Sequence, residues 1–380
     1  MALIAVNTRM LIKDKLDGTG WFAFETLKRI VTQHPEHRFI FFFDRKFNAE
    51  FIFSSNILPV VIYPQARHPW LWYTWFEISI HRALKKYRPD LFFSPESFIC
   101  SKAAVPQVAV IHDLNFEHFP QYMPAQVARY YSKWSRIAAQ NAKRIGTVSE
   151  FSRQDIVKTY NINIEKTDVL YNGIHDLYKP LSAAEQEQVR NQYTLGCRYI
   201  IYTGSLHQRK NTANMVRAFA QYKKKYGGGL KFLLVSDRSK MEGDLQLALS
   251  EIGIEKDLIF TGRLSAKALA QLTASAEAMM YVSFFEGFGI PVIEAMRCGV
   301  PVITSSVSCL PEISGNAALC VDPHSVNAIT GAMEQVLQHQ EFAEQLKQKG
   351  KIRQQDFSWD KTASLTWQSL QLVLAEKGKE

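Results

Sequence analysis

The feature that most constrains this chain is the segment from Ser283 to Met296, in which two glycines surround an aromatic residue and a proline follows. An apolar run from Ala278 to Val282 precedes it and predicts a short buried strand. Pro291 suits the first position of a helix, where an N–H group would be unpaired anyway, and Gly299 suits the end of that helix. The segment therefore predicts a strand, a tight glycine-rich turn and a helix.

The turn has the composition of a site for a diphosphate that carries a sugar at each end. We expect the amides of Gly289, Ile290 and Val292 to point out of the helix start, where the helix dipole adds to their attraction for phosphate. Glu286 and Glu294 flank the turn with seven residues between them. Carboxylates accept hydrogen bonds from hydroxyls and do not bind phosphate oxygens, so the two glutamates suit the sugars.

Around this segment, short apolar strands alternate with helical runs in two successive series, from Leu3 to Leu170 and from Arg198 to Val321. At 380 residues the chain is long enough for two domains. The two series predict an α/β protein with two doubly wound, Rossmann-like domains facing a cleft. We place the linker in the polar segment from His175 to Glu187, with the first domain at residues 1–178 and the second at residues 179–357.

The net charge limits the classes of partner, and the cysteines indicate the cellular compartment. The net charge of +9 leans to the first half of the chain, which suits an anionic partner such as a phospholipid surface or a lipid diphosphate, although basicity that only aids solubility is equally open. We expect no nucleic acid as a partner.

The five cysteines are scattered and form no Cys-x-x-Cys pair, so we expect reduced thiols and no metal site. Without a signal peptide or a run of ~20 apolar residues, a cytoplasmic protein is expected.

An aromatic-dense stretch from Trp70 to Phe76 runs into a helical segment that carries Arg82, Lys85 and Lys86. Tryptophans beside clustered cations are typical of a membrane interface. Core packing next to a solvated helix face explains the pattern equally well. Peripheral contact with the inner face of a membrane is therefore one of two open hypotheses for this stretch.

Four residues of the second series are further candidates for binding a nucleotide. Gly204 follows a predicted strand and lets the backbone approach a ligand closely. Arg209 and Lys210 then supply a planar fork and a point charge, and both suit a diphosphate. Arg263 follows the strand from Leu258 to Phe260, and ligands bind at the carboxyl ends of strands in open α/β sheets, so it is a candidate contact to a base or ribose.

In the first series, His112 stands directly after the strand from Gln107 to Ile111. Its imidazole can donate to a sugar hydroxyl or stabilise a developing charge. Asp113 can orient this histidine or cap the following segment. A lone histidine at such a place is more often structural, so the position alone does not decide its role.

Gly18 and Gly20 precede a helical run from Trp21 and, with Ala23 and Asp44, imitate a dinucleotide-binding fingerprint. That interpretation would make the chain a nicotinamide-dependent oxidoreductase. About a dozen residues separate the first strand from Gly18, whereas the fingerprint needs an immediate turn. The spacing therefore disfavours an oxidoreductase.

The pattern Glu286, seven residues, Glu294, with a Gly-aromatic-Gly-x-Pro turn inside, resembles the signature of the retaining glycosyltransferases of family 4, the group 1 glycosyltransferases. The resemblance continues in motif order along nearly the whole chain. It implies the GT-B fold, with a C-terminal helix at residues 358–380 that crosses back onto the first domain. It also implies metal-independent transfer of a hexose, such as mannose or glucose, from a GDP- or UDP-linked donor to a glycan or lipid-linked acceptor in the synthesis of cell-surface polysaccharide such as lipopolysaccharide, with no separate cofactor.

The resemblance also implies roles for single residues. Arg209 and Lys210 would grip the diphosphate, Glu286 would hold the transferred sugar and Glu294 the ribose. His112 would lie near the reacting face of the sugar. Front-face attack is generally argued for the family, so a nucleophilic Glu286 is the less favoured alternative. The remaining contacts to the donor would come from Gly18, Gly20, Gly204, Arg263, Phe288 and Gly289. A non-catalytic nucleotide-sugar-binding protein is a further alternative, which the intact charged residues disfavour.

Overall fold

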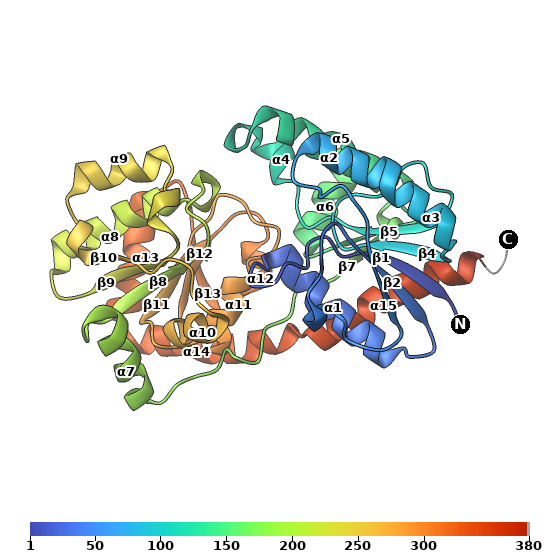
Figure 1. Cartoon of the computed structure of the whole chain (residues 1–380). Helices are drawn as coiled ribbons and strands as arrows, with labels where there is room; N and C mark the ends of the chain where they lie inside the picture. The colour runs from blue at the N-terminus through green and yellow to red at the C-terminus, as the bar shows by residue number, and fades with distance from the viewer. Residues whose placement is uncertain (378–380) are drawn as a thin grey trace. The chain divides into compact units, whose positions relative to one another are not determined.

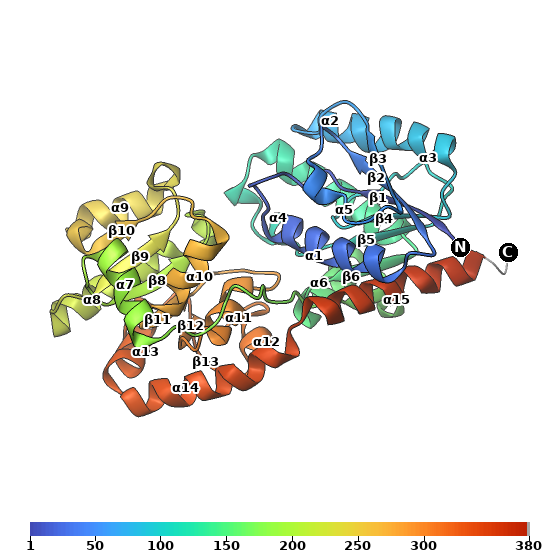
Figure 2. The same ribbon diagram turned by 60° about the horizontal axis from the view of Figure 1, so that its bottom comes forward.

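The computed structural model describes residues 1–377 and divides into two compact units. The first unit joins Met1–Gly173 to the chain from Ser358 onward, and the second is Ile174–Phe357 (Figures 1 and 2). The change of unit after Gly173 comes a few residues before the expected boundary at residues 178 and 179. The reason is that Tyr178 already belongs to the second unit, where its hydroxyl donates a hydrogen bond to Glu294.

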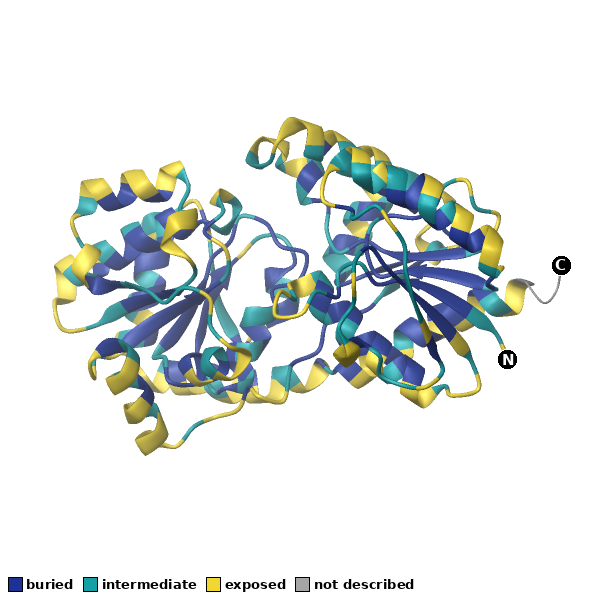
Figure 3. Cartoon of the chain, in the orientation of Figure 1, coloured by how far each residue is buried: buried dark blue, intermediate teal, exposed yellow. Residues whose placement is uncertain are grey.

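The first unit is built on a seven-stranded parallel sheet with the order β3-β2-β1-β4-β5-β6-β7. The chain order reverses between β1 and β4, which makes their carboxyl ends the topological switch point of this sheet. Most of its strands are apolar on both faces, as expected for a parallel sheet covered by helices, and they form the buried centre of the unit (Figure 3). The strands are β1 (Leu3–Asn7), β2 (Arg38–Phe43), β3 (Ile57–Val61), β4 (Leu91–Ser94), β5 (Gln107–Val110), β6 (Arg144–Thr147) and β7 (Thr167–Val169).

Helices connect these strands, and their starts follow local capping signals. Ser149 caps α6 by accepting a hydrogen bond from the amide of Ser152 at 3.1 Å. A π-helical turn, Trp75–Ile80, joins two of the helices into one segment. The helices of this unit are α1 (Gly18–Gln33), α2 (Pro69–Thr74), α3 (His81–Tyr87), α4 (Asn115–His118), α5 (Ala125–Asn141), α6 (Glu150–Tyr160) and α15 (Trp359–Lys377).

The C-terminal helix α15 belongs to the first unit, as the sequence led us to expect. It packs against α1, and Arg29 of α1 donates to Asp360 at 2.7 Å. Thr362 donates to the carbonyl of Tyr171, and Ser369 donates to Asp168 of β7. Residues far apart in the sequence thus tie the end of the chain to its first unit.

The second unit has a six-stranded parallel sheet with the order β10-β9-β8-β11-β12-β13, and its switch point lies between β8 and β11. The strands are β8 (Tyr199–Thr203), β9 (Lys231–Val235), β10 (Leu258–Phe260), β11 (Ala278–Tyr281), β12 (Val302–Ser305) and β13 (Ala318–Val321). The helices are α7 (Ala183–Thr194), α8 (Thr212–Tyr226), α9 (Gly243–Ile252), α10 (Ala266–Ala274), α11 (Ile290–Arg297), α12 (Leu310–Ser314), α13 (Val326–Gln338) and α14 (Gln340–Arg353). Two doubly wound α/β units were predicted, and this prediction is confirmed.

Two helix starts differ from the sequence expectation. α1 begins at Gly18, before Trp21, because the side chain of Asp17 caps it by accepting from the amide of Gly20 at 2.9 Å. α11 begins at Ile290, so Pro291 takes the second helical position. Among the helices of residues 1–377, none is long and apolar enough to cross a membrane.

Candidate active site

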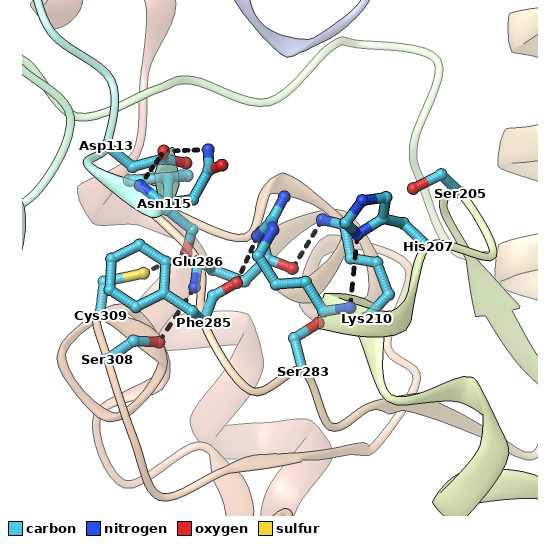
Figure 4. A network of polar contacts seen from close by, with 12 residues as sticks. Asp113, Asn115, Ser205, His207, Lys210, Ser283, Phe285, Glu286, Ser308 and Cys309 are labelled. Atoms are coloured by element: carbon cyan, nitrogen blue, oxygen red, sulfur yellow. Dashed lines mark hydrogen bonds and ion pairs between the residues drawn. The ribbon is translucent and has the colours of Figure 1, made fainter. Parts of the chain in front are cut away.

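The candidate site lies at the switch point of the second sheet, where β8 and β11 end side by side. Arg209 and Lys210 follow β8 in a 3₁₀ turn, Gln208–Lys210, just before α8. Glu286 lies in the loop between β11 and α11. Because parallel neighbours end at the same edge of a sheet, these segments meet although more than 70 residues separate them in the chain (Figure 4).

Glu286 is buried and bound by both cations. Its Oε1 accepts from the Lys210 ammonium at 2.6 Å, and its Oε2 accepts from the Arg209 guanidinium at 3.2 Å. Burial alone would raise the pKa of Glu286, but the two cations outweigh it and lower the pKa to about 2. The carboxylate is therefore ionised and can only accept hydrogen bonds, as required for a group that holds sugar hydroxyls.

The three charged side chains together carry one net positive charge. Arg209 also donates to the carbonyl of Phe285, which fixes its guanidinium beside the carboxylate. The sequence predicted that these residues serve one site, but it did not predict that the glutamate pairs with the cations. An incoming diphosphate would have to share these cations with Glu286, and the excess charge favours that exchange.

Two buried tyrosines that the sequence reasoning missed lie behind Lys210. The ammonium is 3.2 Å from the Tyr281 hydroxyl and 5.5 Å from the centre of its ring. Tyr202 stacks on Tyr281 and donates to the carbonyl of Ser205 at 2.6 Å. The signal available in the sequence was a tyrosine near the end of each apolar strand, Tyr202 in β8 and Tyr281 in β11.

Gly204 holds the turn after β8 in a conformation that other residues rarely adopt, with φ at +150°. A Cβ at this position would lie 2.7 Å from the hydroxyl of Tyr202. Only glycine therefore fits the turn that leads from β8 toward Arg209. Contact between this backbone and a ligand stays a prediction.

Glu294, on α11, differs sharply from Glu286. It is half-buried and accepts a hydrogen bond from Tyr178. Desolvation raises the pKa of Glu294 to about 8, against the opposite effect of the Tyr178 hydrogen bond. At neutral pH most of this carboxyl group is protonated, so it can donate one hydrogen bond and accept others, which suits a pair of ribose hydroxyls.

The start of α11 corrects part of the expected phosphate site. Gly289 caps the helix with φ at +94°. The amide of Val292 donates to the carbonyl of Gly289 at 3.0 Å, so the expectation that it is free was wrong. The side chain of Phe288 is buried edge-to-face against Phe357, with ring centres 5.6 Å apart, and a contact between Phe288 and the donor stays a prediction. The amides of Gly289 and Ile290 remain the predicted anion contacts at this helix start.

Arg263 lies in the turn after β10 and is exposed. Its contact to a base or ribose stays a prediction.

His112, in the first unit, directly follows β5. Its Nε2 is 3.0 Å from the carbonyl of Pro95, and the ring lies edge-on to Phe22. Burial lowers the pKa of His112, so the ring is neutral, with Nε2 as the donor and Nδ1 as an acceptor. The imidazole can therefore accept from a sugar hydroxyl, whereas the expectation that it donates to one was wrong.

Asp113, next to this histidine, takes the capping role that was one of its two expected alternatives. Its Oδ1 accepts from the amide of Asn115 at 3.0 Å, at the start of α4. The carboxylate also raises the pKa of His112 slightly through its charge, against the larger effect of burial.

The glycines before α1 do not form the expected phosphate cradle. The amide of Gly20 is bound by the Asp17 carboxylate at 2.9 Å, so it is not available to a diphosphate. A Cβ on Gly20 would lie 3.3 Å from the carbonyl of Met10, which gives this glycine a packing role. Gly18 faces open space and its contact to a ligand stays a prediction.

A polar cluster at the switch point of the first sheet was also missed. Asn7 ends β1 and donates to Glu96 at 2.6 Å and to Ser94, the last residue of β4, at 3.1 Å. Arg9 donates to both oxygens of Glu96, and this pair is almost entirely buried. Polar residues at the ends of two apolar strands were the signal in the sequence.

The aromatic stretch from Trp70 to Phe76 is mostly part of the core. Trp75 and Phe76 are buried, and the indole of Trp75 donates to the carbonyl of Ile62 at 2.9 Å. Trp72 is half-buried and donates to Ala66. Only Trp70, 68% exposed, projects a tryptophan ring to the surface, so the expectation of three interfacial tryptophans reduces to one.

Within residues 1–377, no group of three histidine, cysteine, aspartate or glutamate side chains is arranged to hold a metal ion.

Comparison with known proteins agrees with this geometry. Residues 16–176 match the family described as Glycosyltransferase Family 4, and residues 185–353 match the family described as Glycosyl transferases group 1. The O-antigen chain mannosyltransferase B of Escherichia coli is 31% identical over 297 residues, which cover 77% of this chain and 76% of that protein.

Solved structures share the fold. Sucrose-phosphate synthase from Thermosynechococcus elongatus has a TM-score of 0.79 at 18% identity, with 99% of this chain and 100% of that chain covered. HepE from Anabaena, in complex with UDP-glucose, has a TM-score of 0.72 at 18% identity, with 99% and 100% covered.

These likenesses define the class of protein: a glycosyltransferase with the GT-B fold. The oxidoreductase and the non-catalytic binding protein are left without support. The chain belongs to the group 1 glycosyltransferases of glycosyltransferase family 4.

Proposed function

We propose that the chain is a retaining, metal-independent hexosyltransferase. It moves mannose or glucose from a GDP- or UDP-linked donor to a glycan or lipid-linked acceptor in the synthesis of cell-surface polysaccharide. The observation that carries this proposal is the buried Glu286 held between Arg209 and Lys210 at the end of a parallel strand. The mannosyltransferase of Escherichia coli and the UDP-glucose complex of HepE support this class of donor and product.

In the proposed reaction, the bond from the anomeric carbon to the diphosphate oxygen breaks and the acceptor oxygen bonds to that carbon from the same face. The acceptor proton passes to the departing diphosphate. Arg209 and Lys210 stabilise the negative charge that grows on the leaving group, which is the role usually given to preorganised cations in a partly buried site. Because these cations come from the protein, the step needs no metal ion.

Other residues hold the reactants. The ionised Glu286 accepts hydrogen bonds from hydroxyls of the transferred sugar. Glu294 binds the ribose, and the neutral imidazole of His112 accepts from a hydroxyl of the reacting sugar. The ionised Glu286 therefore contacts the hydroxyls of the transferred sugar, and the protonated Glu294 contacts those of the ribose.

The test is a panel of GDP-mannose, UDP-glucose and UDP-galactose with the purified chain, with and without EDTA. Donor hydrolysis and transfer to a lipid-linked oligosaccharide are both measured. We expect turnover of one donor, an anomeric configuration in the product that matches the donor by the one-bond C1–H1 coupling in NMR, and no loss in EDTA. An inverted product would contradict retention, and loss of turnover in EDTA would contradict the metal-free step.

We also propose that the acceptor is reached at a membrane surface, on its cytoplasmic side. Trp70, Tyr63 and Tyr73 are exposed aromatic side chains near α2, and Lys85 and Lys86 are exposed on α3. Aromatic rings beside cations suit the interface of an anionic bilayer.

The membrane proposal is tested by sedimentation with vesicles of phosphatidylcholine and phosphatidylglycerol. Trp70→Ala/Tyr73→Ala should reduce binding several-fold. A control variant outside α2 in the same unit, Tyr122→Ala, should bind as the wild type does. Equal binding by all three proteins would contradict a membrane contact through α2.

A further inference from the structure

A basic cavity lies in the first unit, at the carboxyl ends of β1 and β2. These strands are parallel neighbours, and the segments that follow them form the walls of the cavity. The cavity has a volume of about 360 Å³, within the usual range for sites that bind small molecules. Its main lining residues are Leu11, Lys13, Arg45, Lys46, Phe47 and Phe51.

The cavity carries an excess of positive charge. Arg45 donates to both oxygens of the adjacent Asp44, at 2.6 and 2.8 Å. Asp44 is fully buried and also accepts from the amide of Ala66 at 2.9 Å, so its oxygens are occupied within the protein. The pair therefore fixes the guanidinium of Arg45 with its other N–H groups available to a ligand.

The two lysines of the cavity supply charge that the protein does not neutralise. Lys13 and Lys46 are both exposed. Within the part of the chain that the structure describes, neither ammonium has an ion-pair partner. With Arg45 already balanced by Asp44, the two lysines leave the cavity with a net positive charge, which attracts anions.

The floor below these cations is apolar. Leu11 and Phe51 are buried, and Phe47 is half-buried with its ring stacked on Phe43 at 4.9 Å between centres. The one polar amide in the lining, Asn48, accepts from the amide of Glu50 at 3.0 Å and caps a short turn. Recognition in this cavity therefore rests on cations above an apolar surface, which suits an anionic head attached to an apolar body.

We propose that this cavity binds a phosphate or diphosphate ester of an apolar alcohol. Phosphate oxygens would accept from Lys13, Lys46 and the outward N–H groups of Arg45, while the first part of the alcohol lies on the rings of the floor. The residues involved belong to the first unit and include none of those at the candidate active site. The assignment of this ester to a lipid-linked acceptor rests on the proposed function, whereas the site itself does not.

The test is isothermal titration calorimetry with farnesyl diphosphate and inorganic pyrophosphate as probes. The full chain carries Arg209→Ala/Lys210→Ala, so that the diphosphate site of the second unit is disabled. We expect farnesyl diphosphate to bind, and pyrophosphate to bind more weakly because it lacks the apolar part. Adding Lys13→Gln/Lys46→Gln should weaken farnesyl diphosphate binding at least about tenfold, since two charge-assisted contacts are lost.

The matched control is Lys143→Gln/Lys158→Gln in the same background, which removes two exposed lysines of the same unit elsewhere. It should bind as strongly as the parent protein, and circular dichroism should show all variants folded. Equal affinity of the two double-lysine variants for farnesyl diphosphate would overturn the proposal. So would an absence of binding by farnesyl diphosphate to the parent protein.

Vesicles of phosphatidylcholine and phosphatidylglycerol distinguish the source of the phosphate. If farnesyl diphosphate competes with vesicles in a manner that depends on Lys13 and Lys46, lipid headgroups share the site and the proposal stands. Vesicle binding that depends on these lysines without any binding of farnesyl diphosphate would overturn it. Donor hydrolysis is measured in parallel with the wild type and with the Lys13→Gln/Lys46→Gln chain, in which Arg209 and Lys210 are intact. If the wild type does not hydrolyse any donor, the proposed function is refuted, whereas the proposed binding of farnesyl diphosphate in the cavity still stands.

Discussion

The two sheets of this protein place a glutamate beside arginine at the same topological position, but with opposite consequences. At the β1–β4 switch point, Glu96 is paired with Arg9, and the charges of these two side chains cancel. At the β8–β11 switch point, Glu286 is paired with Arg209 and Lys210, and one positive charge is left over. The first arrangement pairs one cation with one carboxylate, whereas the second pairs two cations with one carboxylate.

The surroundings reinforce this difference. The guanidinium of Arg9 lies 5.8 Å from the ring centres of Trp72, Phe76 and Phe98. These aromatic faces stabilise the cation without adding charge, and burial with ion pairing makes the pair a fixed part of the core. The ammonium of Lys210 lies 5.5 Å from the ring centre of Tyr281 and 3.2 Å from the hydroxyl of the same residue. The same topological position thus holds a structural ion pair, Arg9–Glu96, in the first unit. In the second unit it holds a chemical ion pair, Glu286 with Arg209 and Lys210.

The largest effect should come from breaking the structural pair. Glu96→Gln leaves the buried Arg9 without a full counter-charge, and we expect the free energy of unfolding to fall by about 3–5 kcal/mol, as for other broken buried pairs. Urea denaturation followed by circular dichroism measures this change. Replacing both residues, Arg9→Met/Glu96→Met, removes the charges together and should cost much less. If Glu96→Gln instead abolished transfer with unchanged stability, the two pairs would not differ in kind.

The chemical pair should respond in rate. Lys210→Ala removes a cation that stabilises the departing diphosphate, and we expect kcat to fall by about 10²- to 10³-fold. Stability should fall less than in Glu96→Gln, because Arg209 still pairs with Glu286. The control is Lys267→Ala, an exposed lysine on α10 of the same unit. A loss of Tm as large as that of Glu96→Gln, with little change in rate, would show that Lys210 is structural too.

A smaller effect is expected from the residue behind Lys210. Tyr281→Phe keeps the ring and removes the hydroxyl that lies 3.2 Å from the ammonium. The loss of one hydrogen bond of about 1 kcal/mol should lower kcat/KM roughly fivefold by allowing Lys210 to move. Tyr226→Phe, on the surface of α8, serves as the control. An unchanged rate would mean that Glu286 alone positions the ammonium.

The last prediction concerns the pH dependence that Glu294 gives to the stability of the protein. The pKa of Glu294 is raised from about 4.5 to about 8, so the folded state binds more protons than the unfolded state between these values. The free energy of unfolding should therefore fall as pH rises from 5 to 8. Glu294→Gln should flatten this dependence, and the gain in Tm over the wild type should be larger at pH 8 than at pH 5. A constant difference in Tm across this range would contradict the raised pKa.

Much of the fold could be predicted because its signals are local. Short apolar runs marked the strands, and Pro291 marked the start of α11 to within one residue. The candidate site was only partly predictable. The residue types and their order identified Glu286, Arg209 and Lys210, but the availability of the Val292 amide and the donor role of His112 were wrong. Both depend on a partner that the pattern did not reveal, the carbonyl of Gly289 and the carbonyl of Pro95.

The sequence by itself determined that this protein has two doubly wound α/β units and a turn suited to a nucleotide sugar, since strand periodicity, glycine positions and charged residue types are properties of short segments. Only the tertiary structure decided the ionisation of the two glutamates in that turn. Glu286 meets cations brought from the end of a neighbouring strand, whereas Glu294 meets a tyrosine and little solvent. The pKa of a carboxyl group depends on charges and desolvation in space, and the sheet order sets both.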